Sequence, residues 1–225
     1  LTLTYIKICG ITTCDQAKKI ASMDIHAIGI IAVKGSPRYV SEEKRREIFN
    51  EITKKNPKIK RVLVVMDLKQ TEIESTFQGS GSPSVIQLHG NESKDYCKEI
   101  RNRNPHIEWW KAIRVKEKKD LDLAKAYEKF VDKLLIDSWS KKSYGGTGYR
   151  IPLEWIKETN FTNPWWIAGG ISSEWIPKVL KNCCPFGIDA SSLLEKKPGI
   201  KDIKKVEELI EEVKKQDRQL FRMSR

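Results

Sequence analysis

The amino-acid sequence predicts an α/β fold, specifically a single-domain (β/α)8 barrel of the TIM type with parallel strands. The first observation is that short β-rich runs alternate with charged amphipathic segments along the whole chain. The second is that there are eight such pairs, the number at which right-handed crossovers close a parallel sheet into this barrel. The third is the length of 225 residues, which suits one large domain. An open doubly wound sheet is the alternative, but no Gly-x-Gly-x-x-Gly follows the first apolar run to mark a dinucleotide site.

Each predicted strand is a short run rich in β-branched, aromatic and aliphatic side chains. In chain order the strands are expected at residues 5–9, 27–32, 61–66, 84–88, 109–113, 133–137, 165–168 and 186–190. A helix is expected after each strand, where apolar residues recur at helical spacing among charged ones. These helices are expected at 14–22, 41–52, 69–77, 93–102, 119–130, 152–158, 173–180 and 203–215. Ser41 and Ser173 precede glutamates and suit helix N-caps, and Pro152 suits a first turn.

The composition indicates one soluble domain. Hydrophobic residues make up 39% of the chain, enough for a core, and charged residues make up 32%. No apolar run approaches the ~18 residues of a membrane span, and the first residues show no basic region followed by an apolar stretch. We therefore expect a cytoplasmic protein with no membrane partner. Residues 1–215 are expected to form the catalytic barrel, and residues 216–225 a basic C-terminal tail that is loosely ordered.

The net charge of +12 comes from 42 Lys and Arg residues against 30 Asp and Glu residues. A nucleic-acid-binding protein is one interpretation of such a charge. The lysines, however, are spread along the predicted helices among acidic residues, so we expect a solvated surface that attracts an anionic substrate and no specific nucleic acid. The five cysteines are an odd number and fit no zinc spacing. No disulfide framework, metal or cofactor is predicted.

Two reactive side chains stand at the C-terminal ends of predicted strands. Cys9 ends the first strand, and Asp137 ends the sixth. In a parallel barrel all strands end at one face, where active sites lie, so a thiol and a carboxyl group there would form a general base and general acid pair. A thiol with a pKa near 8.5 needs only a modest lowering to act as a base near neutral pH. Lys7 on the same strand could supply or oppose that shift.

The ends of the seventh and eighth strands predict a phosphate site. Phosphate groups bind in TIM barrels at the loops after these two strands. Gly169 and Gly170 can bring bare backbone N–H groups close to an anion. Ser191 and Ser192 add hydroxyl groups beside an expected helix N-terminus, where backbone N–H groups and the helix dipole favour an anion.

Short motifs at the strand ends occur in a specific order and spacing. They are Lys-Ile-Cys-Gly-Ile-Thr at 7–12, Ser-Pro-Arg-Tyr-Val-Ser at 36–41, Gln-Leu-His-Gly at 87–90, Trp-Lys-Ala-Ile at 110–113, Leu-Ile-Asp-Ser at 135–138, Gly-Gly-Thr-Gly at 145–148, Ala-Gly-Gly-Ile at 168–171 and Asp-Ala-Ser-Ser at 189–192. Each motif alone is a weak signal. As a set, from Lys7 to about Asp202, they resemble the phosphoribosylanthranilate isomerase family of the tryptophan pathway.

The resemblance implies a TIM barrel that catalyses an Amadori rearrangement without cofactor or metal. The substrate would be N-(5'-phosphoribosyl)anthranilate and the product 1-(2-carboxyphenylamino)-1-deoxyribulose 5-phosphate. It also implies that Asp137 is the general acid, that Cys9 is the general base and that Arg38 binds the anthranilate carboxylate, an anion suited to the guanidinium fork. His89 either lines the anthranilate pocket or bridges loops, and Asp189 either contacts a substrate hydroxyl or orients the eighth loop. A monomer or homodimer is expected.

The chain departs from the family pattern at three loops. Val65-Met66-Asp67-Leu68 stands where the family usually has Val-Phe-Val-Asn, and the loop after residues 145–148 is two residues longer. Leu193 stands where the family has glycine, which implies an altered turn at the phosphate site if that glycine has a positive φ. Three alternatives therefore stay open: another phosphate-binding barrel enzyme, a barrel that has lost its activity, and a basic nucleic-acid-binding protein.

Overall fold

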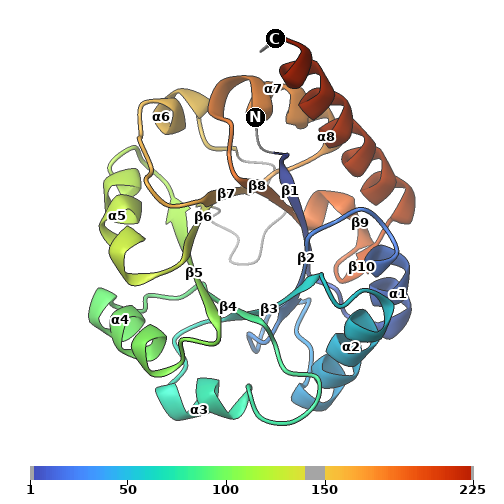
Figure 1. Ribbon diagram of the computed structural model, residues 1–225, viewed down its shortest axis with the longest axis vertical. Coiled ribbons are helices and arrows are strands. Elements are labelled where there is room, and N and C mark those ends of the chain that lie inside the picture. Colours follow the sequence, from blue (N-terminus) through green and yellow to red (C-terminus); the bar gives the residue numbers. More distant parts are fainter. Residues whose placement is uncertain (1–2, 140–149, 224–225) are drawn as a thin grey trace.

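The structure is a computed structural model that describes residues 3–139 and 150–223. Eight parallel strands form a closed barrel, and the helices surround it (Figure 1). The strands are β1 (Tyr5–Cys9), β2 (Ala27–Ile31), β3 (Lys60–Val65), β4 (Val85–Leu88), β5 (Glu108–Val115), β6 (Lys133–Ser138), β7 (Trp165–Ala168) and β8 (Gly187–Ala190). Each strand pairs with the next in sequence, and β8 pairs with β1 to close the ring. The predicted fold class is confirmed.

The helices follow the strands in the predicted order. They are α1 (Cys14–Ala21), α2 (Glu42–Lys55), α3 (Gln70–Ser75), α4 (Lys94–Arg103), α5 (Asp120–Tyr127), α6 (Leu153–Lys157), α7 (Ile176–Cys183) and α8 (Ile203–Met223). Ser41 caps α2, because its side chain accepts a hydrogen bond from the backbone N–H of Lys44. Ser173 is not an N-cap as predicted: it lies in a 3₁₀ turn, η2 (Ser173–Trp175), that leads directly into α7.

Helix α8 is longer than predicted. It continues through residues 216–223, so the expectation of a loosely ordered tail from residue 216 is corrected for these residues. Two contacts explain the extension. The Asp217 carboxylate accepts hydrogen bonds from the backbone N–H and the hydroxyl of Thr4, at 2.9 and 2.7 Å, and Leu220 packs against the core. The last turns of α8 are therefore held against the segment that precedes β1.

Register places alternate residues of every strand inside the barrel. The lower interior is filled by an apolar cluster of Ala27, Val62, Val85, Trp110, Ala112, Leu135, Trp166 and Ala168. The rings of Trp110 and Trp166 stack at 4.8 Å, and both side chains are buried in this cluster. A second, larger cluster fills the space between the strands and the helices. The polar interior positions above the first cluster form the C-terminal mouth of the barrel.

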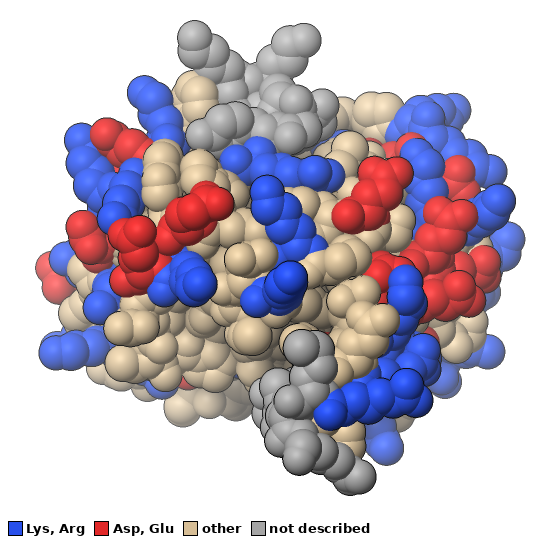
Figure 2. Space-filling model, turned by 90° about the horizontal axis from the view of Figure 1, so that it is seen from above, with Lys and Arg blue, Asp and Glu red and all other residues tan. Residues whose placement is uncertain are grey.

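The surface carries charges of both signs. Figure 2 shows basic and acidic side chains intermixed over one face of the molecule. Many are paired, as in the contact between Arg46 and Glu42 at 2.9 Å and that between Lys54 and Glu51 at 2.8 Å. Among the described residues no helix is long and apolar enough to cross a membrane.

Candidate active site

Cys9 is the last residue of β1, and its side chain faces the barrel interior. Its register partner on β2 is Gly29, and a Cβ atom at position 29 would lie only 2.6 Å from Cys9 Sγ. Glycine therefore leaves the space that the thiol fills. After Cys9 the chain turns at Gly10, which has a φ of +80° and whose missing Cβ would lie 2.7 Å from Arg38 Cδ. Cys9 itself is buried, at 6% exposure.

Lys7 and Asp189 lie directly below Cys9 in the barrel interior. They are register partners on β1 and β8, and Lys7 Nζ is 2.8 Å from Asp189 Oδ2. Burial raises the pKa of the Cys9 thiol above its ordinary value, although the positive charge of Lys7 acts in the opposite direction. The sequence left open whether Lys7 supplies or opposes a lowering of the thiol pKa; in the folded barrel Lys7 does lower it, but desolvation outweighs the lysine. Burial alone would lower the pKa of Lys7, but the charges of Asp189 and Cys9 hold it above its ordinary value.

Asp137 stands near the end of β6, and His89 lies beside it. His89 Nε2 is 3.3 Å from Asp137 Oδ2, and His89 Nδ1 is 3.1 Å from Nε2 of the buried Gln87. Asp137 and Arg114 are register partners. Both side chains therefore project from the interior face of the sheet at the mouth of the barrel. Sequence reasoning left the place of His89 open between the pocket and a loop bridge. In the structure the imidazole of His89 lies against the carboxyl group of Asp137. This contact depends on how far apart the ends of β4 and β6 lie in the barrel.

Arg38 is buried and paired. Its Nε and one terminal nitrogen contact the two carboxylate oxygens of Glu195 at 2.8 and 2.7 Å, the bidentate geometry of strong Arg–carboxylate pairs. Lys201 Nζ contacts the same carboxylate at 2.8 Å. Burial alone would raise the pKa of Glu195, but Arg38 and Lys201 hold it below its ordinary value. Glu195 is a site residue that the sequence prediction missed, and the two cations hold it at the mouth of the barrel.

Glu195 and Lys201 belong to a small hairpin that was not predicted. It consists of β9 (Glu195–Lys197) and β10 (Ile200–Lys201), preceded by the 3₁₀ turn η3 (Ser192–Leu194). Leu193 lies in that turn and is not among the residues with a positive φ, so the family's glycine is not needed for this backbone. The third loop does carry strain, because Asp67 has a φ of +48°.

The predicted phosphate loops lie at the ends of β7 and β8. Gly169 and Gly170 have φ values of +84° and +66°, and a Cβ at position 169 would overlap the side chain of Ser138. Arg150, which the sequence prediction missed, donates from Nε to the carbonyl oxygen of Gly170 at 3.1 Å. These contacts shape a tight loop in which only glycine fits at position 169.

The two serines after β8 differ in their contacts. The hydroxyl of Ser191 donates to the carbonyl oxygen of Cys9 at 3.0 Å, and Lys201 Nζ donates to the backbone oxygen of Ser191 at 3.1 Å. Ser191 thus joins the eighth loop to the residue that carries the thiol. Ser192 begins η3. The motif at residues 145–148 lies outside the described residues.

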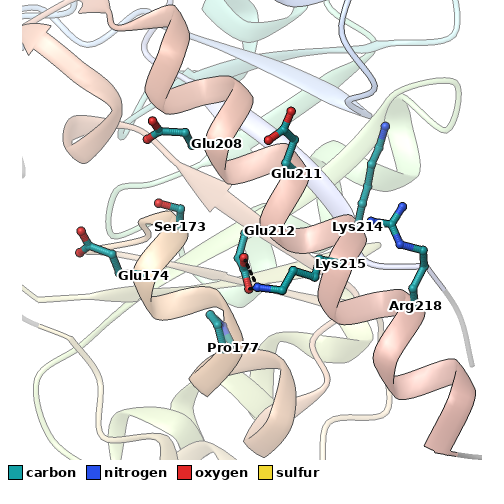
Figure 3. A pocket seen from close by; sticks show the side chains of 9 residues that line it. All are labelled: Ser173, Glu174, Pro177, Glu208, Glu211, Glu212, Lys214, Lys215 and Arg218. Carbon is teal, nitrogen blue, oxygen red and sulfur yellow. Dashed lines mark hydrogen bonds and ion pairs between the residues drawn. The ribbon is translucent and has the colours of Figure 1, made fainter.

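A groove of about 790 Å³ lies elsewhere, between η2, α7 and α8 (Figure 3). It is lined by Ser173, Glu174, Pro177, Glu208, Glu211, Glu212, Lys214, Lys215 and Arg218. None of the predicted site residues lines it, and its lining carries four carboxylates and three cationic side chains. In the described part of the chain, no group of three or more His, Cys, Asp or Glu side chains could hold a metal ion.

Comparisons with known sequences point in one direction. The family model for N-(5'-phosphoribosyl)anthranilate (PRA) isomerase matches residues 6–212. N-(5'-phosphoribosyl)anthranilate isomerase of Synechococcus elongatus is 39% identical over 201 residues, which cover 89% of this chain and 92% of the relative. The enzyme of Microcystis aeruginosa is 39% identical over 213 residues, which cover 93% of this chain and 97% of the relative.

Solved structures agree with the sequence comparison. Phosphoribosyl anthranilate isomerase from Thermotoga maritima superposes with a TM-score of 0.83 at 27% identity, covering 94% of this chain and 99% of that chain. A complex of such an enzyme with reduced 1-(o-carboxyphenylamino)-1-deoxyribulose 5-phosphate gives 0.76 at 27% identity with the same coverage. A structure of monomers of the dimeric Thermotoga maritima enzyme gives 0.77 at 26% identity, again with the same coverage.

Proposed function

This chain belongs to the N-(5'-phosphoribosyl)anthranilate isomerase family, and we propose that Cys9 and Asp137 carry out the proton transfers of its reaction. The enzyme catalyses the Amadori rearrangement of N-(5'-phosphoribosyl)anthranilate to 1-(2-carboxyphenylamino)-1-deoxyribulose 5-phosphate in tryptophan biosynthesis. The observation that carries the proposal is the position of both side chains on interior register positions at the C-terminal ends of β1 and β6. Both groups can therefore act on one substrate bound across the mouth of the barrel.

Asp137 acts first, as the general acid. Its carboxylic acid gives a proton to the ring oxygen of the ribose, the bond between C1' and that oxygen breaks, and the anilino nitrogen shares its lone pair with C1' to form an iminium ion. The contact with His89 at 3.3 Å supports this role. When Gln87 donates to His89 Nδ1, the ring proton sits on Nε2 and can stabilise the carboxylate that the step leaves behind.

Cys9 acts second, as the general base. Its thiolate takes the proton from C2' of the iminium ion, and the C–H electron pair forms the C1'–C2' double bond of an enolamine. Tautomerisation then adds a proton at C1' and removes one from the C2' hydroxyl, which gives the ketone. Substrate and product have the same composition, so two groups that exchange protons are sufficient. Cys9 is a strong base once ionised, because burial raises its pKa.

The two anionic ends of the substrate are bound by different loops. Arg38 binds the anthranilate carboxylate, and its bidentate contact with Glu195 holds the guanidinium group in one orientation. The backbone of Gly169 and Gly170 and the start of η3 at Ser192 bind the phosphate group. Ser191 supports this loop through its hydrogen bond to the Cys9 carbonyl oxygen, and His89 lines the anthranilate side of the pocket.

The proposal extends to the setting in which the enzyme works. The catalytic domain comprises the barrel with the whole of α8, so it extends past the predicted boundary at residue 215. The enzyme acts in the cytoplasm as a monomer or a homodimer on one phosphorylated small molecule. The dimeric relative among the solved structures supports the second assembly. No specific nucleic-acid partner is proposed, because basic and acidic side chains are intermixed on the surface (Figure 2).

A fluorescence assay tests the roles of Cys9 and Asp137. N-(5'-phosphoribosyl)anthranilate is generated in place, and its loss is followed with the wild type, Cys9→Ser and Asp137→Asn. We expect kcat to fall at least about a hundredfold in each variant. The matched controls Cys184→Ser and Asp122→Asn change an exposed thiol and an exposed carboxylate and should keep kcat within about twofold. Full activity in either site variant would reject that residue's role.

A further inference from the structure

Lys7 is a buried charged group of the barrel interior to which the proton transfers assign no task. Its side chain is completely buried, at 0% exposure, two residues before Cys9 on β1. Removing an ammonium group from water is costly unless it is paired and hydrogen-bonded. Such a group below a reacting thiol therefore needs a physical explanation.

Lys7 lies against the sulfur of Cys9 because Gly29 has no side chain. The position where a Cβ of residue 29 would stand is 2.6 Å from Cys9 Sγ and 3.1 Å from both Cε and Nζ of Lys7. The ammonium group and the sulfur thus flank the same small space, on the same side of the sheet. Asp189, on the strand that closes the barrel, holds the ammonium group from the other side at 2.8 Å. The second carboxylate oxygen of Asp189 is buried without a hydrogen-bond partner among the described residues.

The charged groups around the thiol come from several elements. Lys7 and Lys201 favour its ionised form, and Asp189 opposes it. Lys201 is itself paired with Glu195 at 2.8 Å, which reduces its effect on the sulfur. Asp137 and His89 act on the ionisation of Asp189 from β6 and from the end of β4. Of the two cations, Lys7 is the one whose influence on the thiol is the larger.

We propose that Lys7 is a positioning residue for the proton transfer: its ammonium group, anchored by Asp189, stabilises the thiolate of Cys9. The inference rests on the proposed role of Cys9 as general base. The thiol proton leaves to solvent before the reaction, Lys7 keeps its proton throughout, and the thiolate takes the C2' proton. Lys7 touches no reacting atom of the substrate.

Alkylation of Cys9 tests the inference without any turnover. Iodoacetamide reacts with the thiolate, and mass spectrometry of the Cys9 peptide gives its rate between pH 7.0 and 9.5. In Lys7→Met we expect the midpoint of the pH–rate profile of Cys9 to rise by at least one pH unit. Below that midpoint the thiolate is then about tenfold rarer. A more basic thiolate is about threefold more nucleophilic, so the observed rate should fall at least about threefold at pH values where Cys9 is mostly protonated.

Two further variants keep the test decisive. Lys7→Met/Asp189→Asn removes both charges and leaves no carboxylate buried without its partner, so it folds if the single variant does not. It should also slow alkylation, because the effect of Lys7 on the thiol is larger than that of Asp189. The matched control is Lys133→Met, which removes a largely buried strand lysine paired with Glu108 at 3.0 Å at the opposite end of the barrel. It should leave the Cys9 rate within twofold of the wild type.

Cys97 reports whether a variant has unfolded. It is buried on α4, and burial raises its pKa to about 12, so it reacts only when the barrel opens. A folded variant without Lys7 in which Cys9 reacts within twofold of the wild-type rate would overturn the inference, because a lysine that only stabilises the fold would not change the ionisation of Cys9. If the wild type catalyses no isomerisation while Lys7→Met still slows alkylation, the role of Cys9 as base falls and the effect of Lys7 on the thiol stands.

Discussion

Replacing Gly29 by alanine should displace the sulfur of Cys9, the proposed general base. The new Cβ would stand 2.6 Å from Cys9 Sγ and 3.1 Å from Lys7 Nζ. Non-bonded heavy atoms settle at about 3.5–4.0 Å, so the sulfur must move by about 1 Å or turn to another rotamer. The φ of Gly29 is not positive, so alanine adds no backbone strain at this position.

The expected cost falls on catalysis more than on stability. A misplacement of about 1 Å costs roughly 10²-fold in rate, because a general base must lie within hydrogen-bond reach of the proton that it removes. Inserting one methyl group into a packed interior costs about 1–3 kcal/mol of folding free energy. Gly29→Ala should therefore remain folded at 25 °C and lose about a hundredfold in kcat.

Gly187→Ala is the matched control. Gly187 is also an interior strand glycine, and its added Cβ would lie 2.6 Å from Cε3 of Trp166, in the apolar cluster below the site. It should lower the Tm by several degrees and keep kcat within about threefold. Steady-state fluorescence kinetics and thermal unfolding of both variants check the prediction. A Gly29→Ala enzyme with kcat within fivefold of the wild type would refute the reasoning that this glycine makes room for the thiol.

Three further predictions concern other parts of the site and the fold. Glu195→Gln removes the carboxylate charge that pairs with Arg38, so the guanidinium group is held less firmly for the substrate carboxylate. Ground-state binding should weaken, with KM raised roughly tenfold and kcat within threefold of the wild type. An unchanged KM in steady-state kinetics would argue against this role of Glu195. Gly169→Ala, at a φ of +84° against Ser138, should weaken competitive inhibition by inorganic phosphate at least tenfold and lower the Tm, and unchanged inhibition would contradict a phosphate loop there. Burial lowers the pKa of His26, whose Nδ1 accepts a hydrogen bond from the backbone N–H of Ile6. The neutral imidazole therefore stabilises the fold fully above pH 6.5, and this contribution is lost as the pH falls towards the lowered pKa of His26. An NMR titration that finds His26 ionising at or above 6.5 would reject this.

The strand pattern could be predicted from sequence because it is local. The residues of β1 (Tyr5–Cys9) and β7 (Trp165–Ala168) coincide with the predicted ranges, since each is an apolar run bounded by polar or turn-forming residues. The hairpin of β9 (Glu195–Lys197) and β10 (Ile200–Lys201) was missed because its two short strands are charged and lack a strand pattern. The last turns of α8 were missed because tertiary contacts with Thr4 hold them.

The same limit applies to the site. The place of Cys9 and Asp137 at the barrel mouth could be predicted, because each ends an apolar run and the barrel topology brings the strand ends together. The pairing of Arg38 with Glu195 spans 157 positions and that of Lys7 with Asp189 spans 182, so both depend on strand register that no local pattern specifies. The rise in the pKa of Cys9 likewise follows from burial, which becomes visible only in the folded barrel.

The most direct test of the account is the kinetic isotope effect of substrate deuterated at C2'. If Cys9 removes this proton, Cys9→Ser slows that step and should raise the isotope effect on kcat above the wild-type value. If Asp137 opens the ring in the preceding step, Asp137→Asn makes ring opening rate-limiting and should reduce the isotope effect towards one. The opposite pattern, or an isotope effect that neither variant changes, would contradict the assignment of base and acid.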